Sequence, residues 1–478
     1  MGEEIGSECF TPEDRERFRQ ALDRETDLLL AWLDTHRDTP RGPTTLGFEI
    51  EAWLCDAEGR ALAENDAFLE AMDSPLVSRE LARFNVELNT SVFTAGPGSF
   101  TAILQELRDT VKRAARAAAR FDGGVLMAGS LATLPPEALG LHHMSPQARF
   151  RALNEAVLEN RARRPLHVDI RGREHLQHDH DDVMLESLAT SFQIHIGSAP
   201  GEAHRSLNAA MVASAPVLAA AGNTPYLFGH DLWEESRIPL FEQAVESGGF
   251  ADSARGPIRR VTFGSGYLHD SVGELFRENR DHFPVMLPVD LHHPPEDLAH
   301  LALHNGTIWR WNRPIVGTDA GGRHHLRVEF RCLPAGPSLI DMLANAAFAL
   351  GLIEWLRDAP GDGTAGTPFA EARDNFYHAA REGLHARLRW GHADPLPAPR
   401  LIRHQLLPRA AEGLENLEID PGERDALLGI IAARVDSGQT GSAWQRRWVA
   451  QHGRDWAGLV RAYRGWQNTG APVHTWGL

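Results

Sequence analysis

Four short segments of the chain alternate, residue by residue, between apolar side chains and charged or amide side chains. They cover residues 47–54, 85–89, 191–196 and 326–331. Successive side chains of a β-strand point to opposite faces of a sheet, so each segment predicts a strand with one apolar and one polar face. If the four strands share one sheet, their apolar residues can fill a single core.

The polar positions of the four segments would then collect on the other face of that sheet. They combine carboxylates, amides, guanidiniums and an imidazole, which are groups that bind metal ions and anions. The set consists of Glu49, Glu51, Glu87, Asn89, Gln193, His195, Arg327, Glu329 and Arg331.

Helical patterns surround these strands. Thr11, followed by Pro12 and two acidic residues, is typical of a helix start, and this helix is expected to run to about residue 35. Further helices are predicted over 77–84, 101–121, 203–221, 338–357, 369–387, 422–436 and 442–452. Residues 125–130 predict one more buried strand.

These elements predict an α+β fold with helices flanking the sheet. We divide the chain into an N-terminal helix and linker (1–45), a catalytic part that contains the strands (46–358) and a helical C-terminal region packed on it (359–478). A stretch rich in glycine and proline at 360–368 marks the last boundary.

Composition and charge narrow the possible functions. The chain has 478 residues, 42% of them hydrophobic, which is enough for a substantial core. The net charge of −17 disfavours nucleic acids and anionic membranes as partners, because phosphates select basic surfaces. Three distant cysteines, a polar start and no apolar run of membrane-spanning length lead us to expect a cytoplasmic protein.

The acidic residues form the first candidate site. Glu49 and Glu51 project from the same face of one strand, and Glu87 and Glu329 come from two others. Two carboxylates roughly 4 Å apart repel each other by about 4 kcal/mol at an intermediate dielectric constant. A cation or protonation relieves such crowding, and oxygen ligands with one imidazole suit Mg²⁺ or Mn²⁺. The alternative is the solvated face of an ordinary antiparallel sheet.

Two arginines form the second candidate site. Arg327 and Arg331 flank Glu329 on the same face of the fourth strand. Because a guanidinium binds phosphate or carboxylate oxygens in pairs, this triplet is a candidate anion site, with a structural ladder of salt bridges as the alternative. The histidine-rich segment 175–182 looks like a metal cluster, but we favour an interpretation without a metal there.

Taken together, the motifs resemble the carboxylate–amine ligases of the glutamate–cysteine ligase family, type two, within the glutamine-synthetase-like superfold. The matching segments are 47–51, 86–90, 191–197, 223–225 and 327–331, in the order in which the family has them. The resemblance implies a curved, mostly antiparallel sheet that forms an open funnel, with nucleotide and divalent cations on its concave polar face.

The resemblance also implies roles for individual residues. An acid seven residues before the second-strand glutamate occurs in the family, and Glu80 occupies that position. The implied metal ligands are Glu49, Glu51, Glu80, Glu87, His195 and Glu329. Glu329 also belongs to the implied catalytic group with the phosphate-binding arginines. The implied nucleotide contacts are Arg327, Arg331, Gln193 and Asn89.

Three further arginines are candidates for binding a substrate carboxylate. They are Arg237, Arg259 and Arg260, which lie in or after the segment where the family's substrate residues are expected. A structural salt bridge is the alternative interpretation of each. No known amino-acid pocket maps onto residues 232–242, so the pair of substrates stays open.

These observations lead to a functional hypothesis. We expect ATP-dependent formation of an amide bond, with ATP and Mg²⁺ or Mn²⁺ as cofactors, between the γ-carboxylate of glutamate and an amine such as that of cysteine. An acyl phosphate would be the intermediate. The partners would be small molecules, with no nucleic acid and no membrane, and assembly with a second copy stays open. The alternatives are a metal-dependent amide hydrolase and a catalytically silent relative that binds nucleotide or amino acid.

Overall fold

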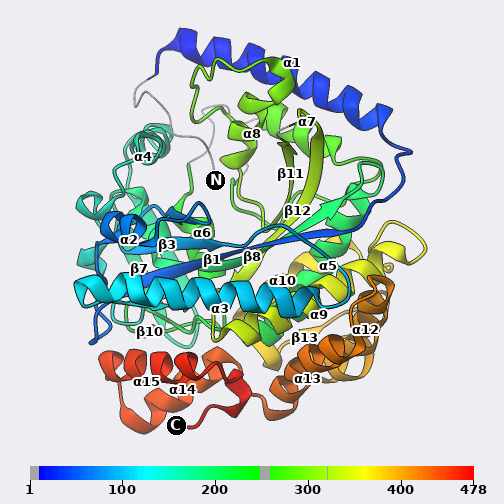
Figure 1. Cartoon of the computed structure of the whole chain (residues 1–478). Helices are drawn as coiled ribbons and strands as arrows, with labels where there is room; N and C mark the ends of the chain where they lie inside the picture. The colour runs from blue at the N-terminus through cyan, green and yellow to red at the C-terminus, as the bar shows by residue number, and fades with distance from the viewer. Residues whose placement is uncertain (1–9, 248–258, 320) are drawn as a thin grey trace.

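A curved antiparallel sheet forms the centre of the protein (Figure 1). The structure is a computed structural model and describes residues 10–247, 259–319 and 321–478. Six strands follow one another across the sheet, namely β11 (Asn312–Thr318), β12 (His324–Pro334), β8 (Ser191–Ser198), β1 (Thr45–Cys55), β3 (Asn85–Asn89) and β2 (Val77–Arg79). The short strands β4 (Phe93–Thr94) and β5 (Gly124–Leu126) also pair with β1. The predicted fold class is confirmed.

The register of the strands decides which polar side chains become neighbours. Glu51 lies opposite Glu87 in the β1–β3 pair, and Glu49 lies opposite Gln193 in the β1–β8 pair. In the β12–β8 pair, Glu329 lies opposite residue 195. All four predicted strands therefore turn their polar positions to the same face.

The apolar positions of these strands form a core with two long helices. Phe48, Ile50, Phe192, Ile194 and Phe330 are all at most 2% exposed. Helix α5 (Ala203–Ala221) packs on β12, and α9 (Leu339–Asp358) packs on α5. Helix α9 is long and apolar enough to cross a membrane, contrary to the expectation from sequence, but most of its apolar window is buried, as in a core helix.

Other helices close the remaining sides of the sheet. Helix α1 (Pro12–Thr35) lies at the top of Figure 1 and packs against α7 (Gly273–His282) and α8 (Ala299–Gly306). The other elements of this part are α2 (Asn65–Met72), α3 (Ser99–Ala118), α4 (Ala148–Asn160), the hairpin β6 (Leu166–Arg171) and β7 (His175–His180), the 3-10 helix Val183–Leu188, the hairpin β9 (Tyr226–Leu227) and β10 (His230–Asp231), and α6 (Arg237–Ala244).

The C-terminal region is helical and packs on the central core. Its elements are α10 (Phe369–Glu382), β13 (Arg387–Leu388), β14 (Leu396–Pro397), α11 (Ala398–Leu401), α12 (Leu407–Asn416), α13 (Pro421–Ser437), α14 (Gly441–His452) and α15 (Trp456–Thr469). Helix α10 contacts α5, while α12 and α13 contact α9. The boundary between residues 358 and 359 stays a prediction.

Several element predictions need correction. Residues 77–84 do not form a helix, because Val77–Arg79 pairs with β3 as a strand and the rest is irregular. The apolar residues of this segment are buried, but they lie on a strand and a turn, although their spacing fits a helix. The strand predicted at 125–130 covers only β5, and α10 ends before Gly383, which has a φ of 54°. The remaining predicted helices are present within a few residues.

The cysteines of the described part are unpaired. Cys55 and Cys332 are buried as free thiols, and Cys9 lies outside the described residues. Burial raises the pKa of the Cys55 thiol to about 11, so this sulfur stays protonated and unreactive near neutral pH.

Candidate functional site

Three strands bring an imidazole and two carboxylates together on the concave face. Glu49 of β1, His195 of β8 and Glu329 of β12 offer ligand atoms that all lie within 4.8 Å of one another. We call these three residues the histidine site. His195 Nε2 lies 2.8 Å from Glu49 Oε1, yet it is buried and has no partner with hydrogen-bond geometry. A buried nitrogen of this kind is an open ligand position for a metal ion.

Glu329 is fixed by two arginines. Arg313 Nη2 donates to Glu329 Oε1 at 3.2 Å and its Nε donates to Oε2, while Arg331 Nη1 donates to Oε2 at 3.1 Å. Burial alone would raise the pKa of Glu329, but the charges of Arg313 and Arg331 outweigh it and hold this pKa far below its usual value. Glu329 is therefore a permanent carboxylate.

Arg313 was not predicted from sequence. It lies on β11 opposite Glu329, on the same face as the other polar residues. The segment Asn312–Thr318 lacks the clean alternation of the other four strands, since Ile315 occupies a position on the polar face and Asn312 one on the apolar face. The signal that revealed the other strands is therefore missing here.

A second group of acids lies beside the histidine site. Glu51 accepts hydrogen bonds from Ser191 N at 2.6 Å, from Ser191 Oγ at 2.8 Å and from Gln193 Nε2 at 3.0 Å. Glu87 accepts from Asn89 Nδ2 at 2.8 Å. The predicted amides Gln193 and Asn89 thus hold the carboxylates of Glu51 and Glu87 in place on the sheet.

Two acids from outside the four predicted strands complete this group. Burial and the charges of Glu87, Glu51 and Glu186 raise the pKa of Glu80 well above its usual value. Burial and the charge of Glu49 raise the pKa of Glu87 to about 7. Burial and the charge of Glu51 raise the pKa of Glu186 to about 8. We call Glu51, Glu80, Glu87 and Glu186 the carboxylate site.

The histidine site fits a hard divalent cation, and the carboxylate site adds negative charge beside it. Carboxylate oxygens with one imidazole are the ligands of Mg²⁺ and Mn²⁺ rather than of softer metals. Burial first, and then repulsion between the acids, raises the pKa values of Glu80, Glu87 and Glu186, and a bound dication would offset the repulsion.

Within the described part of the chain, the histidine site is the one group of three ligands close enough for a metal. Of the residues predicted as metal ligands, Glu49, His195 and Glu329 therefore lie where a cation could bind. Glu51, Glu80 and Glu87 do not belong to such a group among the described residues, and the metal role of all six stays a prediction.

The two predicted phosphate-binding arginines differ in what they contact. Arg331 Nη1 donates to Gln193 Oε1 at 2.9 Å, and its buried Nε has no partner among the described residues. Arg327 Nε donates to His195 Nδ1 at 3.1 Å, and no carboxylate lies within ion-pair distance of Arg327 in the described parts of the chain. A guanidinium without a carboxylate partner, beside a metal site, is suited to bind a phosphate.

The three candidate substrate arginines lie in different surroundings. Arg260 is buried and its Nη1 donates to Thr307 O at 3.0 Å, so its substrate role stays a prediction. Arg237 is buried, its Nε lies 2.9 Å from Glu235 Oε1, and its Nη2 donates to Cys332 O at 2.7 Å. These contacts favour the structural salt bridge that the sequence left open for Arg237. Arg259 is exposed and follows the undescribed residues 248–258, so its substrate role stays a prediction.

The histidine-rich segment forms the hairpin strand β7 and no metal cluster of three ligands within the described residues. His175 Nε2 lies 3.0 Å from Asp169 Oδ1, and His180 Nε2 lies 2.9 Å from Asp182 Oδ1. Each of these two histidines thus has its own carboxylate, which accounts for the pattern without a metal.

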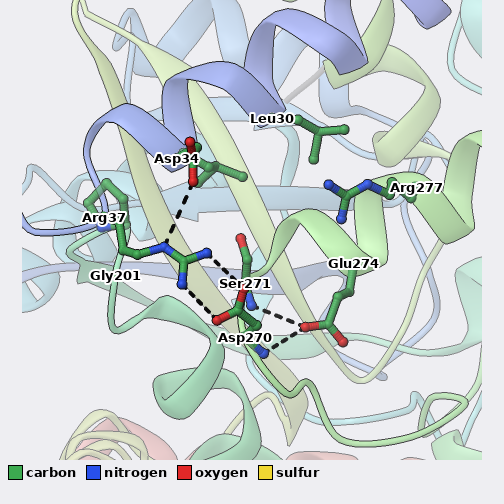
Figure 2. A pocket seen from close by; sticks show the side chains of 10 residues that line it. Leu30, Asp34, Arg37, Gly201, Asp270, Ser271, Glu274 and Arg277 are labelled. Carbon is green, nitrogen blue, oxygen red and sulfur yellow. Dashed lines mark hydrogen bonds and ion pairs between the residues drawn. The ribbon is translucent and has the colours of Figure 1, made fainter.

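A small cavity of about 110 Å³ lies elsewhere, between α1, the segment after β8 and the start of α7 (Figure 2). Arg37 spans its edge and donates to both oxygens of Asp270, at 2.8 and 2.7 Å. Glu274 accepts from the backbone N–H of Asp270 at 2.8 Å. None of the predicted site residues lines this cavity, and these charged groups are already paired with protein partners.

The raised pKa values of Glu87 and Glu186 predict that these two carboxyls cost the metal-free protein stability as pH rises from about 5 to 8. The folded pKa values of Glu87 (about 7) and Glu186 (about 8) exceed the ordinary value of 4.5, so the folded state holds protons that the unfolded state has released. The resulting loss is absent below pH 4.5, grows as pH rises towards the folded pKa values and levels off above them, and it is of the order of 3 kcal/mol or more for each of the two groups.

Urea unfolding with EDTA at a series of pH values measures this loss. Carboxyls with lowered pKa, such as Glu329, already contribute fully at pH 5 and do not mask it. Glu186→Gln should flatten the profile, and Mg²⁺ should do the same by cancelling the repulsion. Burial lowers the pKa of His304 to about 4, which makes wild-type stability rise up to about pH 6.5, so the decisive quantity is the difference between wild type and Glu186→Gln. A difference that does not grow from pH 5 to pH 8 would contradict the prediction.

Comparisons with known proteins agree with this geometry. The sequence matches the glutamate–cysteine ligase family 2 over residues 45–462. The fold is similar to the glutamate–cysteine ligase of Francisella tularensis in complex with AMP, with 12% identity, a TM-score of 0.51 and coverage of 90% of both chains. It is also similar to a bifunctional glutathione synthetase from Pasteurella multocida, with 13% identity, a TM-score of 0.51 and coverage of 89% of this chain and 53% of that one. No curated protein matches the sequence.

Proposed function

The chain belongs to glutamate–cysteine ligase family 2, and from this premise we propose that it joins the γ-carboxylate of glutamate to an amine at the expense of ATP. The resemblance seen in the sequence is confirmed by the family match, which covers most of the chain. An ATP-dependent, amide-forming ligase is the activity class of this family and of its structural relatives. The identities of the carboxylate and the amine are our proposal.

The chemical problem is one of charge. A free carboxylate is a poor acylating agent, so the γ-phosphoryl group of ATP must first be transferred to it to give an acyl phosphate. The anionic carboxylate must approach an anionic phosphate, and cations aimed at the phosphate oxygens lower that barrier. A divalent cation bound at these acids would supply such positive charge.

One observation carries the proposal. Glu49, His195 and Glu329, which lie far apart in sequence, present ligand atoms within 4.8 Å of one another beside Arg327, a guanidinium that has no carboxylate partner among the described residues. A hydrolase of neutral amides has no use for such an unpaired arginine. A silent relative would have no reason to keep mutually repelling acids, whose raised pKa values cost stability.

Different residues of the chain have different roles in the proposed reaction. Rigid strands position the acids, so little ordering is needed when ATP arrives. His195 Nδ1 accepts a hydrogen bond from Arg327 in the metal-free protein. A neutral imidazole that binds a metal through Nε2 carries its proton on Nδ1 and cannot accept this bond, so Arg327 would be free to turn to a phosphate. Arg331, held by Gln193 and Glu329, would be the second phosphate contact.

Release of ADP measures the proposed activity. Protein supplied with ATP and Mg²⁺ should release ADP only when both glutamate and an amine are present, and a panel of amino acids and simple amines identifies the amine. Hydroxylamine should replace the amine and give a hydroxamate, because it traps an acyl phosphate. EDTA should abolish both products.

Two outcomes would contradict the proposal. Cleavage of an amide without ATP would indicate the metal-dependent hydrolase. Binding of ATP or amino acid without ADP release, hydroxamate or amide, over the whole panel, would indicate the silent relative. A reaction that proceeds without glutamate and uses another carboxylate would support the ligase activity but change the identity of its carboxylate substrate.

A further inference from the structure

The segment 223–225, which matches the family, contributes no ligand to the histidine site or to the carboxylate site. It follows α5 directly, and Asn223 and Thr224 are buried. Asn223 Nδ2 donates to Ala335 O at 2.8 Å, and the backbone N–H of Asn223 donates to Glu235 Oε2 at 3.2 Å. Asn223 therefore holds the residue that follows β12 and, at the same time, a buried carboxylate.

Strand β12 contains a bulge at the site. The register of the β12–β8 pair shifts between Phe330 and Leu333. Arg331 and Cys332 therefore lie opposite a single residue of β8, Gln193. A bulge bends its strand, redirects side chains and leaves its extra residue without ladder partners. The conformation of this bulge thus decides where the guanidinium of Arg331 points.

Arg237, at the start of α6, holds the bulge. It is 2% exposed, and its Nη2 donates to Cys332 O at 2.7 Å. Its Nε lies 2.9 Å from Oε1 of Glu235, which is fully buried and accepts from Asn223. Because a guanidinium is planar and presents its donors in fixed directions, a partner on Nε also orients the Nη2 donor. Glu235 therefore fixes the direction in which Arg237 contacts the bulge.

Two helices of the C-terminal region hold the other end of these contacts. Gln445 Nε2 of α14 donates to Asn223 O at 2.9 Å, and Asn223 Nδ2 also donates to the Tyr463 hydroxyl of α15 at 2.8 Å. All three side chains are buried, and a close-packed interior transmits displacements. A continuous series of buried polar contacts thus runs from α14 and α15 through Asn223, Glu235 and Arg237 to β12.

Arg331 connects this series with the candidate site. Its Nη1 donates to Gln193 Oε1 at 2.9 Å and to Glu329 Oε2 at 3.1 Å. A displacement of a reacting or binding group by about 1 Å can cost about 100-fold in rate. We propose that Arg237 is a positioning residue, which fixes the β12 bulge through the carbonyl of Cys332 and so aims Arg331 at the phosphate. The inference rests on the phosphate contact proposed for Arg331 above.

A double variant, Glu235→Gln with Arg237→Met, removes this contact without leaving a buried charge unpaired. The glutamine keeps an oxygen for the N–H of Asn223. The kcat of hydroxamate formation from glutamate, ATP and hydroxylamine should fall about 30- to 100-fold, and the Kd for ATP should rise about 10-fold. The KM for glutamate should stay within about twofold, because Arg331 is proposed to contact the phosphate and not the carboxylate donor.

The same double variant in an Arg331→Gln background distinguishes positioning from a general loss of structure. A residue that acts only through Arg331 has no effect once that guanidinium is absent. The kcat and the Kd for ATP should therefore change by less than about threefold when the pair is replaced in this background. Independent effects would instead reduce both proteins by the same factor.

A matched control is the buried ion pair of Arg434 and Asp341, which joins α13 to α9. Both partners are as buried as Arg237 and Glu235. Arg434→Met with Asp341→Asn should lower the melting temperature and leave the kcat within about twofold of wild type. Thermal unfolding shows whether each variant folds. Arg237→Lys, which keeps the charge and loses the fork, should give an intermediate loss of kcat and provides a second variant if the double variant does not fold.

Two results would overturn the inference. An equal loss of kcat in the wild-type and the Arg331→Gln backgrounds would make Arg237 a purely structural residue. An unchanged kcat and Kd for ATP in the folded double variant would exclude any influence on Arg331. Absence of hydroxamate from wild-type protein would refute the ligase activity alone, because the ATP affinities of the same variants would still test the coupling between Arg237 and Arg331.

Discussion

Glu87→Gln should make the metal-free protein more stable and, at the same time, inactive. Glu87 is buried, and burial together with the charge of Glu49 raises its pKa to about 7, so its ionisation at neutral pH opposes folding. Glutamine keeps an oxygen that accepts from Asn89 and removes the charge. We expect a gain of about 1–3 kcal/mol in the free energy of unfolding with EDTA and a loss of about a thousandfold in ADP release.

Urea unfolding at two pH values makes this prediction specific. The gain should be larger at pH 8 than at pH 5, because below its folded pKa Glu87 is already protonated and neutral. Glu70→Gln on α2 should change stability by less than about 0.5 kcal/mol at both. A Glu87→Gln protein that is less stable than wild type, or that remains active, would show that Glu87 has a structural role instead.

Glu329→Gln should abolish activity with the opposite effect on stability. Glu329 is the shared partner of two arginines, Arg313 and Arg331, and all three are buried or nearly so. Removing one member of a buried ion pair leaves an uncompensated charge, which costs about 3–5 kcal/mol. We expect a loss of that size in the free energy of unfolding, together with loss of ADP release.

The sign of this change distinguishes Glu329 from the acids of the carboxylate site. Chemical unfolding of Glu329→Gln and Glu87→Gln under the same metal-free conditions compares them directly. A double variant that also replaces Arg313 by methionine should regain part of the stability lost by Glu329→Gln and none of its activity. Equal shifts in the same direction for both single variants would contradict the electrostatic account of the site.

Residue alternation is sufficient to find most of the site. The period of two in the four segments places Glu49, Glu51, Glu87, His195 and Glu329 on one face, because the same pattern that buries one face of a sheet leaves the polar residues on the other. Helices with strong caps, such as α1 with Thr11, are equally accessible to prediction. Alternation says nothing about which strands pair, so the neighbours of each acid are defined only by the strand register of the folded protein.

The residues that the sequence did not identify lie on elements without such a pattern. Arg313 lies on a strand whose alternation is broken, and Glu186 lies on a 3-10 helix. Residues 77–84 have apolar spacing that fits a helix, but pairing with β3 overrides it. The destabilising effect of Glu329→Gln is one consequence, because it cannot be foreseen from the sequence without knowing that Glu329 pairs with Arg313.

The central claim is that the crowded acids of the concave face exist to hold divalent cations. Titration of the protein with Mn²⁺, followed by the electron paramagnetic resonance signal of the free ion, measures this most directly. Wild-type protein should bind Mn²⁺ at neutral pH, more tightly when ATP is present, and Glu87→Gln should bind it far more weakly although that variant is folded and more stable. Equal Mn²⁺ binding by the two proteins, or none by wild type even with ATP, would contradict the account.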